Sequence, residues 1–590
     1  MVEPRQSIGA PAVYLLLLGL PLAQSATESD SFMPLRLLIL GIGLGLGLWA
    51  PGAGRLPRSV GYGLIAAGAV FVIAALAGVT PLLSLIGRYP RYEGLPIMVG
   101  YALALVVGAR LVGPDARRLR AHALNALVLA SIANAAMALI QWTGNPDARV
   151  TGLLGNSTTL ANVSLVALAV LACQLSGGSW WRLVGAAAAA GCLVLAASRG
   201  ALLGGIVAAL AVLLLRPLVA ERGRWWWGPL AAAGLAGAAW LAPGSRARLA
   251  GQTPFAESTA DGRLLLWQDS WRLIADQPLL GVGPSRFVDT VGGYHTEVWA
   301  AQLGPYAPPD SPHNLVLQVL ASTGWLGLLA LAGLGICVVR RLWLARPWDR
   351  WLLGSVVATL ALATSYLTSF TDPVSLTMLL VVLGGGLALP AQARPVWFVT
   401  GRRLAAVATV IVASALGGAA IAAETRYSQA IAAGGDPAGL VSVTQVRPWD
   451  ADLARRVGYT AARLAEQGAI DPAGFVPRMQ LTCDQLPGSV ECLQVLADLQ
   501  DLSGRHSDAL ATLSRAVELE PINVDTVLRQ GVAHVGLGQY AEAKAAFDRA
   551  IALRPTAPEP WENLARLYDF QGRHADAATA RARAEELRRR

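Results

Sequence analysis

The sequence predicts an all-α protein in which a polytopic bundle of membrane-spanning helices is followed by a soluble α-solenoid. Apolar runs long enough to cross a bilayer follow one another through residues 1–423, and about 20 apolar residues suffice for one crossing. Beyond residue 423 the chain gains charge, and a pattern of Gly, Ala and Pro recurs every 34 residues. The 590-residue chain is 54% hydrophobic and 14% charged, whereas a soluble domain carries about 25% charged residues.

The apolar runs indicate 12 or 13 spans, the first of them short for a crossing. It is followed by Ala23-Gln24-Ser25-Ala26, which could pass for a signal-peptidase site, so whether residues 1–26 are removed is left open. The expected spans are residues 10–24, 34–50, 60–80, 94–112, 122–142, 157–176, 183–198, 200–217, 226–242, 314–339, 351–370, 373–391 and 404–423.

Basic residues gather in alternate loops, which predicts the orientation of the chain. Short loops with an excess of Arg face the cytoplasm, so the net charge of +9 reflects topology and does not indicate nucleic-acid binding. With thirteen spans, the long loop 244–313 and everything after residue 423 lie on the exoplasmic side. The arginines expected on the cytoplasmic side are Arg55, Arg58, Arg117, Arg118, Arg120, Arg182, Arg216, Arg222, Arg224, Arg340, Arg341, Arg346, Arg350, Arg394, Arg402 and Arg403.

The long exoplasmic loop carries more polar functionality than any other segment between spans. An enzyme embedded in a bilayer keeps its polar chemistry in such a loop or at the helix ends that face it. The loop gathers Arg263, Asp269, Arg272, Arg286, His295, Glu297, Asp310 and His313.

Several arginines lie on the side where arginine is normally scarce. Arg199 ends one apolar helix and starts the next, and an arginine at membrane depth is costly and usually retained for a partner. Snorkelling to lipid headgroups is the alternative, and it is the favoured interpretation for Arg272 and Arg286. The other members of this set are Arg88, Arg91 and Arg263.

The tail contains three segments that align at a fixed spacing. Gly504-Arg505-His506-Ser507-Asp508-Ala509 is followed 34 residues later by Gly538-Gln539-Tyr540-Ala541-Glu542-Ala543, and again by Gly572-Arg573-His574-Ala575-Asp576-Ala577. A helix-turn-helix unit of 34 residues with these small residues resembles the tetratricopeptide repeat. Such arrays form concave binding surfaces, so a protein partner is expected.

The predicted domains are a membrane domain over residues 1–423, a helical linker or degenerate repeats over 424–487, and tetratricopeptide repeats over 488–590. Five cysteines are present, of which Cys483 and Cys492 lie in the tail. They would pair if the tail faces an oxidising compartment, and the sequence leaves that pairing open.

The exoplasmic Arg and His residues indicate phosphate chemistry. The sequence shows no Gly-rich nucleotide loop, no Cys/His metal spacing and no Ser nucleophile elbow, so no cofactor or metal is expected. Arginine binds phosphate through its planar fork, and histidine acts as acid or base near neutral pH. A membrane pocket of this kind suits a lipid-linked phosphate or pyrophosphate.

Short motifs spread over residues 30–395 resemble the O-antigen ligase family, which also includes O-antigen polymerases and bacterial O-linked oligosaccharyltransferases. The motifs are Gly155-Asn156-Ser157, Ser198-Arg199-Gly200-Ala201, Gly262-Arg263 with Trp267, Pro278-Leu279-Leu280-Gly281-Val282-Gly283, His313-Asn314 with Gly324, and Ile86-Gly87-Arg88-Tyr89 with Arg91-Tyr92-Glu93-Gly94.

The resemblance implies a metal-independent glycosyltransferase of the GT-C type in the bacterial inner membrane, acting in lipopolysaccharide or polysaccharide biosynthesis. It would pass a glycan from undecaprenyl pyrophosphate to a glycan, lipid or protein acceptor. Arg199 and Arg263 would bind the pyrophosphate and stabilise its developing charge, and His313 would orient or deprotonate the acceptor hydroxyl. The resemblance assigns substrate binding to Arg88, Arg91, Asn156, Arg286 and Asn314.

Simpler roles remain open for some of these residues. Asn156 would also serve as a helix cap, His313 would also satisfy backbone groups at a helix entry, and the spacing alone does not show whether Asp310 orients His313.

Three other functions remain as alternatives. A polysaccharide polymerase would differ only in its acceptor. A small-anion transporter should show ionisable residues in mid-span and broken helices in matched halves, and the sequence shows little of either. A membrane scaffold would leave Arg199, Arg263 and His313 unexplained. The exoplasmic repeats go beyond what transfer to a lipid acceptor requires, and they favour a protein acceptor or docking to an assembly complex.

Overall fold

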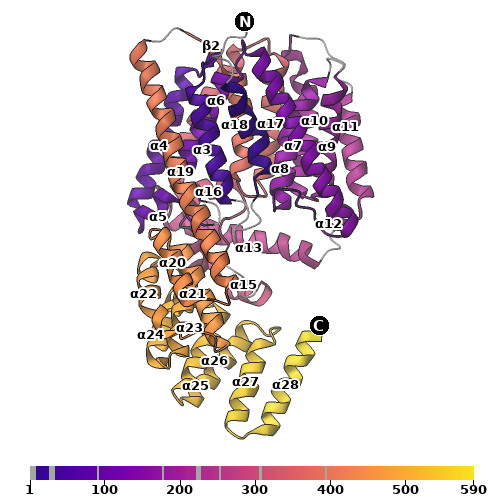
Figure 1. Ribbon diagram of the computed structural model, residues 1–590. Helices are drawn as coiled ribbons and strands as arrows, with labels where there is room; N and C mark the ends of the chain where they lie inside the picture. Colours follow the sequence, from indigo (N-terminus) through magenta and orange to yellow (C-terminus); the bar gives the residue numbers. More distant parts are fainter. Residues whose placement is uncertain are drawn as a thin grey trace.

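The computed structural model describes residues 8–24, 33–89, 92–175, 179–220, 227–250, 254–303, 309–392 and 395–589. It consists of a bundle of roughly parallel helices from which an array of shorter helices extends at one end (Figure 1). Apart from the two-residue strands β1 (Gly54–Arg55) and β2 (Leu389–Pro390), which pair antiparallel, the regular elements described are helical. The predicted all-α class is confirmed.

Each expected span corresponds to a helix in the bundle. Among the described residues, five helical segments are long and apolar enough to cross a membrane by length and composition: α4 (Arg58–Ala77), α7 (Arg117–Gly144), α10 (Arg199–Leu215) with the turn η4 (Arg216–Leu218), α16 (Leu315–Leu344), and residues Trp397–Ala432 of α19 (Val396–Ala432). Shorter apolar helices lie beside them: Gly9–Leu22 (α1, η2 and α2), α3 (Met33–Trp49), α6 (Leu95–Leu111), α8 (Ser157–Cys173), α9 (Trp180–Leu195) and α18 (Pro373–Leu387). The bundle is completed by α11 (Trp227–Leu241) and α17 (Arg350–Tyr366).

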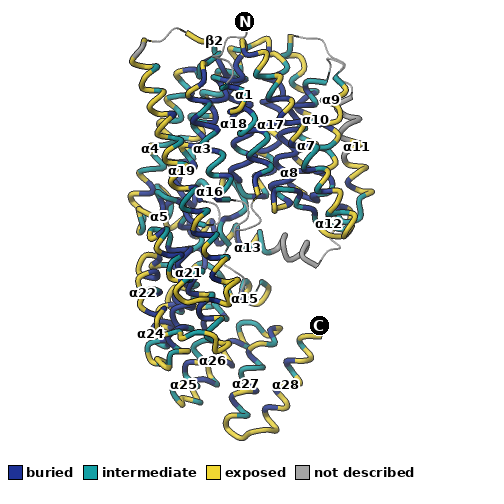
Figure 2. Tube along the Cα trace, viewed as in Figure 1, coloured by how far each residue is buried: buried dark blue, intermediate teal, exposed yellow. Residues whose placement is uncertain are grey.

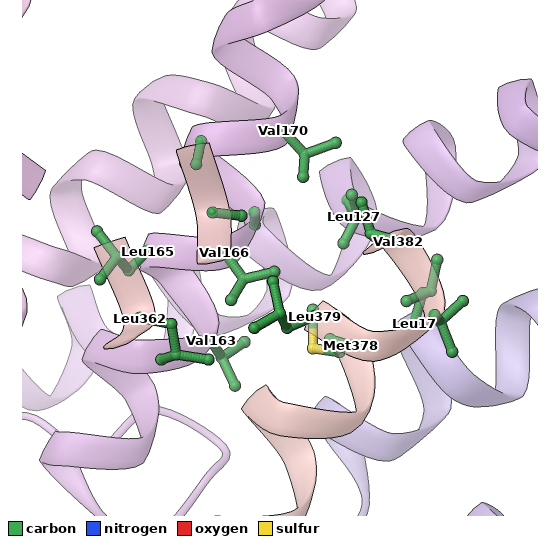
Figure 3. Close-up of a cluster of buried hydrophobic side chains, with 14 of the residues drawn as sticks. Leu17, Leu127, Val163, Leu165, Val166, Val170, Leu362, Met378, Leu379 and Val382 are labelled. Atoms are coloured by element: carbon green, nitrogen blue, oxygen red, sulfur yellow. The ribbon is translucent and has the colours of Figure 1, made fainter. Parts of the chain in front are cut away.

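The outer surface of the bundle is apolar, as a lipid-facing surface requires. On α4, Ile65 and Ile73 are 69% and 53% exposed, and Figure 2 shows exposed residues along the outer helices around a buried interior. That interior is packed with branched apolar side chains and methionine, and those labelled in Figure 3 are Leu17, Leu127, Val163, Leu165, Val166, Val170, Leu362, Met378, Leu379 and Val382.

The alternating glycines of α3 bring its backbone against α19. A Cβ on Gly41 would lie 1.9 Å from the Cβ of Ala413, and one on Gly45 would lie 2.4 Å from Val410 Cγ2. Neither contact is possible for a larger residue, so the small residues allow the two helices to approach closely.

α16 is broken at Gly324, where the backbone has a φ of 63°. The break frees backbone groups that pair with the long loop: Trp325 N–H donates to Pro278 O (2.8 Å), and Val282 N–H donates to Ala321 O (2.8 Å). A Cβ on Gly324 would lie 2.2 Å from the Leu279 carbonyl. The Pro278–Gly283 motif therefore docks the loop into the broken helix.

The second half of the long loop folds as α14 (Phe287–Thr290), η5 (Val291–Tyr294) and α15 (Glu297–Gln302). The expected domain boundary at residue 423 falls inside α19, which continues out of the bundle as a single 37-residue helix. Residues 424–487 contain α20 (Pro437–Val446), α21 (Ala451–Glu466), η6 (Ala473–Phe475) and α22 (Val476–Gln485).

Three antiparallel helix pairs follow, as the 34-residue period predicts: α23 (Val490–Leu502) with α24 (His506–Leu519), α25 (Val524–Gly536) with α26 (Tyr540–Leu553), and α27 (Glu559–Phe570) with α28 (His574–Arg589). Their turns hold Gly504, Gly538 and Gly572 at φ of 76°, 72° and 73°. Glycine adopts this left-handed backbone without steric cost, which explains why it recurs at these positions.

Candidate active site at the end of the bundle

Two helices close the end of the bundle that faces the repeats. They are α12 (Pro243–Leu249) and α13 (Pro254–Asp276), and α13 lies across the bundle axis (Figure 1). On α13, Arg263 and Trp267 are one turn apart, and the Trp267 Nε1–H donates to the Pro312 carbonyl at 2.9 Å. This bond ties α13 to the segment that leads into His313.

Four arginines from four different elements line one cavity of about 320 Å³. Arg199 begins α10, Arg248 lies on α12, Arg263 lies on α13, and Arg149 belongs to the loop after α7. The hydroxyl-bearing residues Thr158, Ser198, Thr368 and Ser369 also line this cavity. The structure thus brings together the two arginines predicted to be catalytic and adds two more.

The four guanidinium groups have no carboxylate partner within the described ranges of the chain. Two of them donate to backbone carbonyls: Arg199 Nε donates to Arg248 O (3.0 Å), and Arg149 Nε donates to Ala196 O (3.2 Å). Burial, followed by repulsion from Arg248 and Arg263, lowers the pKa of Arg149 to about 10. Burial, followed by repulsion from Arg248 and Arg199, lowers the pKa of Arg263. A cluster of like charges in a partly buried cavity is matched to an anion with several negative charges.

His313 lines a neighbouring cavity of about 330 Å³, together with Asn156, Asp310 and Asp372. Its backbone has a φ of 51°, a strained conformation for a residue with a Cβ, and its ring lies 5.8 Å from that of Phe370. The two cavities adjoin, because the successive residues Thr158 and Thr159 line one each, as do Ser369 and Phe370.

Asn156 and Asn314 each cap the helix that follows. The Asn156 side chain accepts from the N–H groups of Thr158 (2.8 Å) and Thr159 (3.2 Å). Asn314 accepts from Val316 and Leu317 N–H, and its Nδ2 donates to Leu367 O at 3.0 Å. Of the two, Asn156 lines the second cavity and Asn314 does not. Capping accounts for the side-chain oxygens of both, and their contact with substrate stays a prediction.

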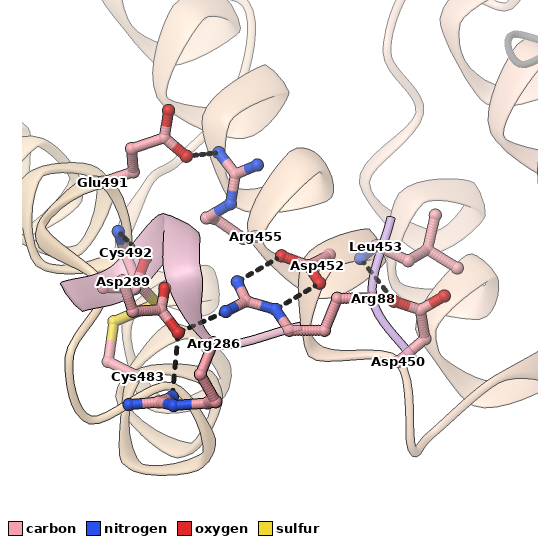
Figure 4. A network of polar contacts seen from close by, with 11 residues as sticks. Arg88, Arg286, Asp289, Asp450, Asp452, Leu453, Arg455, Cys483, Glu491 and Cys492 are labelled. Carbon is pink, nitrogen blue, oxygen red and sulfur yellow. Dashed lines mark hydrogen bonds and ion pairs between the residues drawn. A yellow bond between two sulfur atoms is a disulfide. The ribbon is translucent and has the colours of Figure 1, made fainter. Parts of the chain in front are cut away.

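Arg88 and Arg286 lie in a buried ion-pair network away from the arginine cavity (Figure 4). Arg88 Nε and Nη2 donate to Asp452 at 2.9 and 2.8 Å, and Arg88 also pairs with Asp289. Arg286 Nη1 lies 2.8 Å from Asp289. Burial alone would lower the pKa of Arg88, but the two carboxylates outweigh it and raise the pKa. These contacts do not show the role in substrate binding that was predicted for Arg88 and Arg286. Arg91, predicted for the same role, lies outside the described residues.

Arg149 and Arg248 are two further site residues that were not predicted from the sequence. Both lie in segments expected on the exoplasmic side, where arginine is normally scarce, so their position alone could have identified them as candidate site residues. Where residues are described, no group of three or more His, Cys, Asp or Glu side chains is arranged to hold a metal ion.

Known proteins resemble this chain over short stretches. The Hsp70-Hsp90 organizing protein of Triticum aestivum is 46% identical over 52 residues, which is 9% of each chain. An FK506-binding protein-like protein of Mus musculus is 34% identical over 118 residues, or 20% of this chain and 33% of that protein. The chain thus spans a third or less of these relatives.

Solved structures match about a quarter of the chain. The crystal structure of MamA is 16% identical, with a TM-score of 0.23, and covers 28% of this chain and 94% of its own. A thermophilic tetratricopeptide repeat protein of Thermus thermophilus is 24% identical, with a TM-score of 0.23, and covers 27% and 86%.

Family comparisons match both parts of the chain. Residues 184–332 match the O-antigen ligase family, and this stretch contains Arg199, Arg248, Arg263 and His313. Residues 495–558 and 528–589 match the tetratricopeptide repeat. The chain therefore carries a domain of the O-antigen ligase family, followed by C-terminal tetratricopeptide repeats.

Proposed function

We propose that the protein is an exoplasmic glycosyltransferase that moves a glycan from undecaprenyl pyrophosphate to the hydroxyl group of an acceptor. The observation that carries this proposal is the cavity in which Arg149, Arg199, Arg248 and Arg263 meet without a carboxylate partner in the described ranges. A pyrophosphate diester supplies two adjacent negative charges, and planar guanidinium groups bind phosphate oxygens bidentately.

In the proposed reaction, the acceptor oxygen bonds to the anomeric carbon while the bond from that carbon to the pyrophosphate oxygen breaks. The electron pair of the broken bond leaves with the carrier pyrophosphate, and His313 takes the proton from the acceptor hydroxyl. The leaving group gains negative charge, which Arg199 and Arg263 stabilise more strongly in the transition state than in the bound substrate.

The placement of His313 supports this division of roles. The two cavities adjoin. The hydrogen bond from Trp267 to Pro312 holds the backbone next to His313 against α13, the helix that carries Arg263. A donor phosphate in one cavity would therefore present its sugar towards an acceptor in the other.

A lipid-linked donor fits the surface next to the arginines. An apolar cavity of about 560 Å³ runs between α7, α8, α9, α10 and α11, and its walls include Trp142, Val194 and Leu195. Val194 and Leu195 directly precede the turn that leads to Arg199. The polyprenyl chain would lie in this groove, where its burial is favourable.

The exoplasmic orientation is supported by the tail as well as by the arginine-rich loops. Cys483 and Cys492 form a disulfide, and disulfides persist in oxidising compartments. The repeats and the long loop would then lie outside the cytoplasm together.

Carrier release by the intact protein in detergent tests the proposal. Arg199→Ala, Arg263→Ala and His313→Ala should each lower release of the undecaprenyl carrier from its glycan by about 100- to 1000-fold. Arg272→Ala is the matched control, because Arg272 lies on the same helix, is half exposed and pairs with Asp269 outside the cavity. Unchanged release in Arg263→Ala, in folded protein, would refute the proposed site. The bond formed in the product separates transfer to lipid or protein from polymerisation.

A further inference from the structure

A third cavity, of about 520 Å³, lies between the long loop and the repeats. One wall comes from Arg88, Asp289, His295 and Trp299, on the loops of the bundle. The opposite wall comes from the first helices of two repeats and the turn between them, with Glu491, Gln494, Glu520, Asn523 and Asp525. The residues of the ion-pair network in Figure 4 that line this cavity are Arg88, Asp289, Asp452, Arg455 and Glu491.

Close packing holds the two walls in place. A Cβ on Gly292 would overlap the Glu520 carboxylate, and one on Gly488 would lie 3.1 Å from the Asp289 carbonyl. Ala300 of α15 is buried in the same apolar cluster as Val524 and Phe547 of the repeats. The cavity is thus bounded by surfaces that already touch, and it is part of one packed unit.

The cavity is acidic. Six carboxylates line it, against two guanidinium groups and one imidazole. Arg88 pairs with Asp289 and Asp452, and Arg455 pairs with Glu491 at 2.9 Å. Two arginines outside the lining also reach it, Arg286 at Asp289 (2.8 Å) and Arg529 at Asp525 (3.3 Å). With these two included, six carboxylates still face four guanidinium groups. Burial is the largest effect on Glu520 and raises its pKa. The nearby carboxylates of Glu491 and Asp289 also raise this pKa, whereas the hydrogen bond from Asn523 and the interaction with His295 lower it. The field inside therefore favours a cation.

The acidic cavity is continuous with the candidate active site. Tyr89 and Asp310 line both this cavity and the cavity that holds His313. A molecule docked between the loop and the repeats would therefore extend directly to the proposed base.

We propose that this cavity docks the acceptor, and that the acceptor is an extended polypeptide segment with basic side chains beside its Ser or Thr hydroxyl. The inference rests on the proposed transferase function. Repeats of this kind present a concave surface, and here the first helices of the repeats form the wall. The surplus of carboxylates attracts Lys and Arg, whereas it repels a phosphorylated glycolipid, which carries negative charge.

Peptide binding to the full-length protein, measured by fluorescence anisotropy without donor, tests the docking site. The probe is a short labelled peptide in which one Ser is flanked by Lys, and the matched probe carries Glu in place of Lys. The Lys peptide should bind, and more weakly as ionic strength rises. Glu520→Gln and Asp525→Asn should each weaken its binding about fivefold to tenfold.

Glu518→Gln is the matched control, because Glu518 is exposed near the end of α24, two residues before Glu520, and does not line the cavity. It should bind the Lys peptide as the unaltered protein does. Asp525→Lys should weaken binding of the Lys peptide and allow binding of the Glu peptide. A folding defect cannot produce this exchange of preference.

Equal binding of the two peptides would overturn the proposal. So would a phosphorylated glycolipid that binds as tightly as the Lys peptide and loses its affinity in Glu520→Gln. Because no donor is present, these outcomes are independent of carrier release: a protein that binds the Lys peptide but releases no carrier refutes the transferase and leaves the docking site intact.

Discussion

The arginine cluster is costly for the isolated protein. Burial and the neighbouring positive charges both lower the pKa of Arg263, which means that both disfavour its charged form. An exposed surface would separate such groups, and an internal carboxylate would neutralise them. Among the described residues, the four arginines are neither separated nor paired with a carboxylate. The cluster is therefore best explained by a ligand that brings negative charge.

Arg149 should matter as much as the two arginines that the sequence singled out. Its guanidinium lines the same cavity and is the one whose pKa falls to about 10. Arg149→Ala would remove a contact to the donor phosphate of the proposed reaction, so we expect carrier release to fall about tenfold or more, with a higher KM for the lipid-linked donor. Steady-state kinetics across donor concentrations would show this.

The control is Arg246→Ala. Arg246 is exposed on α12, two residues from Arg248, and does not line the cavity. If the two variants lose the same amount of activity, general charge at this end of the bundle is sufficient and a specific site at Arg149 is ruled out.

The break in α16 shows how a local irregularity positions the loop. Gly324 opens the helix, and the freed backbone groups pair with residues 278–282. The same loop leads through α14 to Asp289 and thus to the ion pairs with Arg88 and Arg286. The Pro278–Gly283 motif therefore supports both the candidate site and the acidic cavity.

Gly324→Ala should destabilise this arrangement. A Cβ there would meet the Leu279 carbonyl at 2.2 Å, and the φ of 63° is unfavourable for alanine. We expect a loss of about 2 kcal/mol or more, seen as a lower thermal unfolding temperature together with reduced carrier release. Gly333→Ala in the same helix meets no atom within 4 Å and should be neutral or slightly stabilising. A similar loss in both variants would show that the effect comes from helix glycine in general.

The elements were predictable where the signal is local. Apolar runs placed the helices, and the 34-residue period placed the repeats. Helix capping by Asn156 was one of the two roles that its position before a span allowed. The partners of Arg88 were not predictable, since Asp452 lies 364 residues away in sequence, and only the folded chain brings them together. The break at Gly324 was missed for the same reason, because its partners lie in a distant loop.

The bundle and the tail are joined by buried charge. Arg88 bonds to Asp289 of the long loop and to Asp452 of α21, and the side chains of Arg88 and Asp452 are each 5% exposed. A buried charge that loses its partner is strongly destabilising, whereas replacing the whole pair by apolar residues is often tolerated. This network therefore fixes how the tail sits against the long loop, and through it the shape of the acidic cavity.

Asp452→Asn should loosen that contact while leaving each part folded. Arg88 keeps Asp289 but loses its charged partner on α21. Loss of one charge-assisted contact costs about 2 kcal/mol, so amide hydrogen exchange in α14 and η5 should become about 30-fold faster. The paired variant Arg88→Met with Asp452→Leu should recover much of the protection, because Asp289 keeps Arg286 and no buried charge lacks a partner. Glu466→Gln, which breaks an exposed pair with Arg463, should change little. The contrary outcome is an equal exchange rate in α14 and η5 for Asp452→Asn and Glu466→Gln. It would mean that packing alone, through Gly292, Gly488 and Ala300, holds the tail in place.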